Sequence, residues 1–299
     1  MSSTENSNNQ AYAELLKNYW DEAPGKASDR ELGNLEVLQG YRGQASKLDQ
    51  SAITLSFVAN EGLLLGGNFL AHGLKEQAWR EFDKAQARAY LAYKIYWLAA
   101  WVPSAYSAPI FGFAQMCAFF SLAMARSDAE QATWYAQQIY NLRRGGLADQ
   151  SCSAVEYVEL HVAMAIAWLQ REWPQKKDIS NNLGPYAGLF MNETAAQKDC
   201  INVCADYHLN ISIGLTEANG HPYTSRHVGH IAYELIGWAA LKRRIDGLQL
   251  SGTSHPMAAS YLFDLSPQED FCDAILDDVE GLAKSIYADD WDAPATIFD

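Results

Sequence analysis

Three potential metal ligands, Cys200, Cys204 and His208, occupy every fourth position of one predicted helix. Thiolates and an imidazole are good zinc ligands, and this spacing places all three side chains on one helical face. At a rise of ~1.5 Å per residue they extend over about 12 Å, which is too far for a single ion. Because free cysteine is among the most buried residue types, we interpret this face as core and expect no metal there.

A second group of ligand-type residues contains His227, His230 and Glu234, with His221 just upstream. The zinc-protease pattern His-Glu-x-x-His places two histidines one turn apart, with a glutamate base between them. In this chain valine and glycine follow the first histidine, so that base is absent. We therefore expect a histidine pair that packs against, or caps, the N-terminus of its helix.

Other catalytic motifs are missing from the sequence. Neither glycine-rich phosphate-binding pattern occurs, and there is no Gly-x-Ser-x-Gly elbow. Carboxylates are plentiful, but without a pocket that positions them no particular pair can be identified as a catalytic acid and base. The sequence thus predicts a protein that is not an enzyme and has no cofactor. A metal-dependent enzyme built around His227 and His230 is the weakest alternative.

The strongest feature is the charge of the C-terminal segment. Residues 264–299 contain eleven acidic residues and a single basic one, Lys284, and so carry −10 of the total formal charge of −14. Asp273, Asp277 and Glu280 are spaced to share one helical face, where like charges cost roughly 0.2–0.5 kcal/mol per pair. A cost carried by the free protein suggests a use in a complex, although a solvated, solubilising face is the alternative.

An aromatic residue lies within this acidic segment. Trp291 follows one aspartate and precedes another, and tryptophan is a frequent anchor of protein interfaces. We predict a partner-binding surface made of Asp273, Asp277, Asp278, Glu280, Asp289, Asp290, Trp291 and Asp292.

The composition restricts the kind of partner. Lysine and arginine number 22 against 36 aspartates and glutamates, and the isoelectric point is about 4.9. Nucleic acids and anionic membranes are bound by clustered basic residues, so neither is expected as a direct partner. A basic protein surface is what this negative field would attract and steer.

Cysteine usage and the first residues bear on location. The five cysteines are an odd number in a long chain, which favours a reducing compartment over a disulfide framework. Residues 1–10 are rich in serine and asparagine and lack the basic and apolar regions of a signal peptide. No apolar stretch reaches ~20 uninterrupted residues. We expect a protein of the bacterial cytoplasm.

Hydrophobic spacing predicts helices along nearly the whole chain and no strand. Gly66-Gly67 is a predicted helix stop, and Ser225 is a predicted N-cap. The predicted helices are Ala11–Trp20, Asp29–Lys47, Asp49–Leu65, Lys75–Val102, Pro109–Arg126, Asp128–Arg144, Asp149–Trp173, Asn192–Glu217, Ser225–Ile245 and Ser266–Ala288.

Successive helices joined by short turns predict an all-α fold of antiparallel helical hairpins, packed as a bundle or a short tetratricopeptide-like stack. No 34-residue repeat is present, so a regular solenoid is not predicted. We expect residues 1–9 to be disordered and residues 10–299 to form a single all-helical domain. A sub-division near 174–190, where proline, asparagine and glycine are frequent, is the alternative.

One segment carries a family resemblance. Residues 238–244 read Trp-Ala-Ala-Leu-Lys-Arg-Arg, and Gly-Leu and then His-Pro-Met follow, ending at Met257. This arrangement resembles the C-terminal part of the immunity protein 49 family, all-helical proteins encoded beside polymorphic toxins, including effectors of contact-dependent and type VI secretion systems. Ile245 and Asp246 intervene where the family pattern is more compact. The resemblance carries over no catalytic residue, only Ala239–Pro256 as a structural signature.

The resemblance implies an immunity protein, an antitoxin that binds a cognate secreted antibacterial toxin and neutralises it by covering the active site. The partner would be a toxin with a basic active-site cleft, toward which an acidic protein is steered. A helical-repeat adaptor or chaperone that binds an effector peptide is the main alternative.

Overall fold

Helices are the only regular elements in the described part of the chain, which confirms the predicted all-α fold. The structure is a computed structural model of residues 1–299. It describes residues 3–20, 23–101, 112–146, 148, 152–175, 181–190, 197–214, 221–225, 227–259, 262, 271 and 273–292. The α-helices are α1 (Ser3–Trp20), α2 (Ala23–Tyr41), α3 (Leu48–Ala71), α4 (Lys75–Trp101), α5 (Phe113–Arg126), α6 (Ala129–Arg144), α8 (Val155–Gln170), α9 (Gln197–Gly214), α10 (Tyr233–Asp246) and α11 (Ala274–Ile286). Short 3₁₀ helices are η1 (Ala45–Lys47), η3 (Gly184–Phe190), η6 (Pro222–Thr224) and η7 (Pro256–Ala258).

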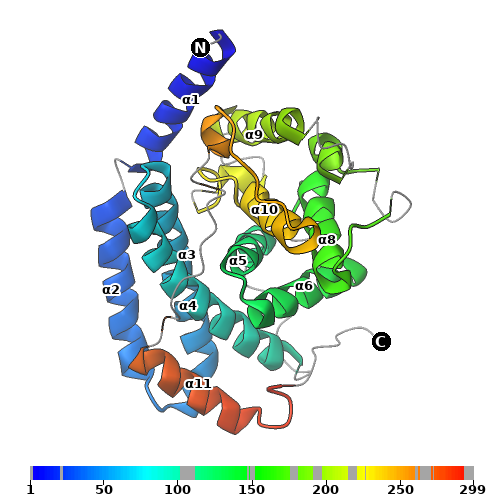
Figure 1. Cartoon of the computed structure of the whole chain (residues 1–299). Helices are drawn as coiled ribbons and strands as arrows, with labels where there is room; N and C mark the ends of the chain where they lie inside the picture. The colour runs from blue at the N-terminus through cyan, green and yellow to red at the C-terminus, as the bar shows by residue number, and fades with distance from the viewer. Residues whose placement is uncertain are drawn as a thin grey trace.

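The helices form two groups (Figure 1). In the first, α2, α3 and α4 lie side by side and α11 packs across α3 and α4. In the second, α10 is central and contacts α5, α8 and α9, while α6 packs on α5 and α8. Buried apolar side chains from Tyr12 to Trp291 form one continuous cluster, so both groups share a core.

The α3–α4 hairpin is the most extensive helix pair, and small residues allow its close approach. A Cβ atom built on Gly62 would lie 2.8 Å from the Ala85 Cβ, and one on Gly66 would lie 2.5 Å from the Phe82 ring. The prediction that Gly66-Gly67 ends a helix is therefore wrong, since α3 continues to Ala71. The glycines stand where another helix comes near, and only tertiary structure shows this.

The N-terminal residues also differ from expectation. Residues 3–9, predicted to be disordered, are the first turns of α1. The Asn8 amide donates to Asp206 of α9 over 2.7 Å, and the Tyr12 hydroxyl donates to the His230 carbonyl over 3.1 Å. These contacts hold α1 against the rest of the protein. Because the acceptors lie about 200 residues further along the chain, the polar sequence of residues 3–9 does not predict them.

Of the helix starts predicted at Asp128 and Ser225, the first agrees with the structure and the second does not. Asp128 caps α6, since its carboxylate accepts from the Gln131 amide over 3.0 Å, as the predicted helix start there requires. Ser225, by contrast, does not cap α10, which begins only at Tyr233. Residues 227–230 form a turn instead, and the predicted histidine pair lies in this turn and not on the helix.

The stretch Ala45–Ala71 is long and apolar enough to cross a membrane by length and composition alone. Because 78% of its most apolar window is buried inside the protein, it has the properties of a core helix. This arrangement is compatible with a soluble protein.

One buried histidine makes stability depend on pH. His161 of α8 is fully buried, its Nδ1 lies 2.8 Å from the Tyr157 carbonyl, and burial lowers its pKa to about 4. In the unfolded chain a histidine has a pKa near 6.5, so the unfolded state binds a proton first as the pH falls. This contribution to stability is therefore complete above about pH 6.5 and is lost as the pH falls toward 4.

We expect the free energy of unfolding to fall by about 2 kcal/mol between pH 7 and pH 4.5 on account of His161 alone. Urea titrations at the two pH values measure this change. The His161→Gln variant should show a smaller pH dependence by about that amount. An identical pH dependence in both proteins would show that another group is responsible.

Candidate partner-binding groove

The acidic helix α11 is amphipathic and docks through a narrow apolar face. Asp273 begins the helix, and its carboxylate accepts from the amides of Ile275 and Leu276 over 2.9 and 2.8 Å. Leu276, Val279 and Ala283 are buried against α3 and α4. Ser266-Pro267, the predicted start, lies outside the described residues. The N-cap role of Asp273 follows from the general preference for aspartate at this position.

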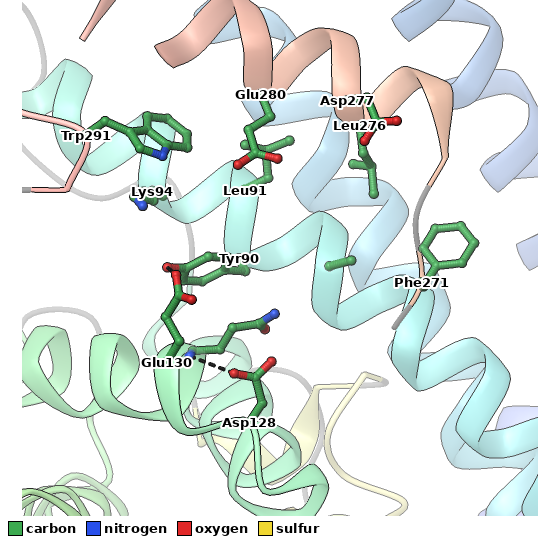
Figure 2. A pocket seen from close by; sticks show the side chains of 12 residues that line it. Tyr90, Leu91, Lys94, Asp128, Glu130, Phe271, Leu276, Asp277, Glu280 and Trp291 are labelled. Atoms are coloured by element: carbon green, nitrogen blue, oxygen red, sulfur yellow. Dashed lines mark hydrogen bonds between the residues drawn. The ribbon is translucent and has the colours of Figure 1, made fainter. Parts of the chain in front are cut away.

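A groove of about 290 Å³ runs between α4, the start of α6 and the C-terminal residues (Figure 2). Helix α4 contributes Tyr90, Leu91 and Lys94, helix α6 and its N-cap contribute Asp128, Glu130 and Gln131, and the C-terminal part contributes Phe271, Leu276, Asp277, Glu280 and Trp291. Residues separated by almost 200 positions in the chain thus face one space.

Aromatic rings form much of the groove wall. Tyr90 packs edge to face against Trp134, with centroids 5.5 Å apart, and its hydroxyl donates to Glu130 over 3.2 Å. Burial, and next the charge of Glu130, raise the pKa of Tyr90 well above its ordinary value, so it stays a neutral donor. Trp291 is only 6% exposed and closes the groove on the C-terminal side.

Lys94 points into this groove from α4 and is held by aromatic rings. Its ammonium lies 4.4 Å from the centroid of the Trp291 ring and 5.6 Å from that of Tyr90, within the range of cation–π attraction. Burial lowers the pKa of Lys94, outweighing the opposite effect of Asp292, Glu130 and Glu280. The lysine is thus retained by the faces of the rings and not by a carboxylate partner.

Negative charge exceeds positive charge in the groove lining. Among the described residues that line it, the four carboxylates of Asp128, Glu130, Asp277 and Glu280 accompany one ammonium, that of Lys94. At its edge Lys284 pairs with Glu280 over 2.8 Å, an exposed ion pair that contributes little to stability. The lining therefore attracts cations even after both lysines are counted.

The predicted partner-binding residues divide into those that line the groove and those that do not. Asp277, Glu280 and Trp291 line it, Asp273 caps α11, and Asp278 forms an ion pair with Arg42, which directly follows α2. The remaining three, Asp289, Asp290 and Asp292, are exposed in the turn and bend that follow α11. Sequence reasoning missed Tyr90, Lys94, Asp128, Glu130 and Phe271, since no pattern in the sequence relates α4 and α6 to the C-terminal segment.

The potential metal ligands of the sequence, among them Cys204 and His208, form hydrogen bonds and ring contacts within the protein. The His208 Nδ1 lies 2.7 Å from the Glu234 carboxylate, its Nε2 lies 3.0 Å from the Gly229 carbonyl, and its ring stacks on Tyr223 at 3.7 Å. The Cys204 thiol donates to the Pro185 carbonyl over 3.5 Å, and burial raises its pKa. Among the residues that the structure describes, no three histidine, cysteine or carboxylate side chains converge closely enough to hold a metal ion.

Two groups of hydrogen-bonded side chains lie beside the His208–Glu234 pair, and ring contacts connect them. Tyr223 bonds Tyr186 through their hydroxyls, and Glu156 accepts from Tyr207 and lies 3.2 Å from the His221 Nε2. Burial would raise the pKa of Glu156, but the hydrogen bonds from Tyr207, from a backbone amide and from His221 together outweigh it and hold the pKa below its ordinary value. Together these hydrogen bonds and ring contacts connect α8, η3, α9 and the residues that precede α10.

Comparisons with protein-family models, with curated proteins and with solved structures yielded no match to this chain.

Proposed function

We propose that the chain is an immunity protein that binds a cognate secreted antibacterial toxin and neutralises it by covering its active site. The observation that carries the proposal is the groove described above, whose four carboxylates and aromatic walls suit a basic protein surface. The sequence resemblance of Ala239–Pro256 to immunity protein 49 supports the same function. That segment contains the second half of α10 and ends at the first residue of η7, and its residues Ala239, Ala240 and Leu241 are buried in the core.

Electrostatics suits the task of neutralisation. A toxin must be captured before it acts on its own producer, so a fast association matters more than a slow dissociation alone. Opposite net potentials raise association rate constants above the ~10⁵–10⁶ M⁻¹s⁻¹ typical of neutral partners. An acidic protein covering a basic cleft gains this advantage, and its own negative charge discourages binding to nucleic acid.

The direct test is expression of the gene encoded next to that of this chain, with and without the chain. We expect the neighbouring product to arrest bacterial growth, and co-expression of the chain to restore growth through a one-to-one complex. Purified toxin should lose its activity when the complex forms. A harmless neighbour, or a toxin that keeps full activity while the chain is bound, would overturn the proposal.

Association kinetics provide a quantitative prediction. At low salt, Asp277→Lys should slow association with the toxin by about tenfold, because it reverses a charge at the groove. Asp199→Lys is the matched control, since Asp199 is also exposed and lies on α9 in the other helix group. Stopped-flow or surface-based kinetics at low and high salt measure both. Equal slowing by both variants would remove the groove from the interface.

A helical-repeat adaptor is the second candidate, because α3–α4 and α5–α6 are successive helical hairpins with short connections. An adaptor or chaperone would bind an effector without inhibiting it. The toxin activity assay therefore separates the two candidates, since only an immunity protein abolishes that activity.

A further inference from the structure

The groove of α4, α6 and α11 combines three features that one kind of ligand satisfies. Its walls are aromatic, its rim is acidic, and its volume is about 290 Å³. Ligand pockets for whole small molecules run from about 300 to 1,000 Å³, so this groove is at the lower limit and suits a single side chain. The excess of carboxylates disfavours an anionic group.

Lys94 gives an independent indication of the ligand. The residue is only 9% exposed, yet its ammonium makes no hydrogen bond or ion pair with any residue that the structure describes. It lies over the Trp291 and Tyr90 rings while the acidic side chains of the rim remain unpaired with it. The groove therefore already holds a cation, and it does so without using its carboxylates.

We infer that this groove is a receptor for one arginine side chain of the protein partner, and that Lys94 occupies the place of the arginine in the free protein. The inference rests on the proposed function for the identity of the partner, and it adds the contact by which that partner is recognised. The incoming guanidinium lies against the Trp291 and Tyr90 rings and donates to the carboxylates of Glu130 and Glu280. Lys94 swings toward solvent along its flexible stem.

Arginine fits this place better than lysine does. A guanidinium is planar, stacks on aromatic faces and donates several hydrogen bonds in one plane, whereas an ammonium is a compact and strongly hydrated charge. Carboxylates on both sides of an aromatic wall can accept from a planar donor while the ring covers its face. Lys94 itself uses only the rings, so its displacement sacrifices no ion pair.

The binding of a fluorescently labelled hexa-arginine peptide to the full chain tests the inference, with hexalysine and spermidine as competitors. We expect hexa-arginine to bind several-fold more tightly than hexalysine. Lys94→Met removes the competing cation and should tighten hexa-arginine binding about fivefold. Glu130→Gln combined with Glu280→Gln should weaken it about tenfold, and Trp291→Leu several-fold.

The matched control is Asp289→Asn combined with Asp290→Asn, which removes the same charge from exposed residues that do not line the groove. This variant should change hexa-arginine affinity by less than twofold. If the two double variants weaken hexa-arginine binding equally, the attraction is unspecific and the inference is overturned. An unchanged hexa-arginine affinity of the Lys94→Met variant would also overturn it. Competition by spermidine as strong as that by hexa-arginine would mean that a free polyamine, and not a protein, is the ligand.

Circular dichroism spectra and urea midpoints of each variant verify that it folds, and Lys94→Met relies on gained affinity, which unfolding cannot imitate. The outcome is independent of the toxin experiment. A chain that neutralises the toxin but ignores hexa-arginine would retain the proposed function and lose the arginine receptor. If the chain binds hexa-arginine as expected but protects no cell, the arginine receptor is retained and the proposed function is lost.

Discussion

The Glu234→Ala variant is expected to unfold with a free energy about 3–5 kcal/mol smaller than that of the unaltered protein. Glu234 is 1% exposed, and its carboxylate lies 2.7 Å from the Nδ1 of His208, which is fully buried. Removal of the carboxylate leaves a buried polar ring without its partner and opens a cavity beside it. The loss should be visible in urea unfolding followed by circular dichroism.

Two further variants identify the cause of that loss. Glu36→Ala is the matched control, because Glu36 is exposed on α2 and its truncation should change stability by no more than about 0.5 kcal/mol. His208→Ala introduced into the Glu234→Ala background should cost much less than His208→Ala alone, since the pair is already broken. Additive losses in this cycle would show that the two side chains act independently, contrary to the geometry.

Local signals predicted most helix positions. The start of α4 at Lys75, the end of α5 at Arg126 and the N-cap of α6 at Asp128 agree with the sequence prediction. Each depends on residues within a few positions, such as a capping carboxylate or the spacing of apolar side chains. The acidic character of the C-terminal helix was equally accessible, because charge is a property of composition.

The groove, the end of α3 and the start of α10 could not be predicted without knowledge of the tertiary structure. Lys94 and Trp291 are almost 200 residues apart, and nothing in either segment indicates that the other lies above it. Gly66 resembled a helix stop because glycine is a poor helix former, yet it is needed for the approach of Phe82. Ser225 resembled an N-cap but lies in the turn that precedes α10. Glycine and serine thus occur both at helix ends and elsewhere, and the residue type alone does not distinguish the two situations.

The two features on which the proposed function rests, the groove and the α10 segment, depend on different parts of the fold. Helix α11 is joined to the α2–α4 group by its apolar face and by the Asp278–Arg42 ion pair, so the acidic residues of the groove are positioned by a few contacts. The buried segment Tyr233–Lys242 of α10, which includes the first residues of the stretch that carries the family resemblance, lies in the other helix group. We therefore expect changes within that segment to act on stability, and changes at the groove to act on binding.

The turn before α10 provides the clearest case of a change that acts on stability. A Cβ atom built on Gly229 would lie 2.1 Å from the backbone oxygen of Tyr223 and 3.1 Å from that of Ser225. The Gly229 amide donates to the Ser225 carbonyl over 2.8 Å, and its own carbonyl faces His208. Gly229→Ala must open this turn, because backbone oxygens cannot rotate away as a flexible side chain does.

We expect Gly229→Ala to lower the free energy of unfolding by about 3 kcal/mol, the upper part of the range for overpacking. Gly281→Ala is the control, because Gly281 lies on α11 with no other atom within 4 Å of an added Cβ. Alanine there should stabilise the helix by up to ~1 kcal/mol through its better helix propensity. The two identical substitutions should thus differ in sign in urea titrations. Equal effects would mean that the 223–229 turn yields to a methyl group, and that the His208 contact does not depend on its closure.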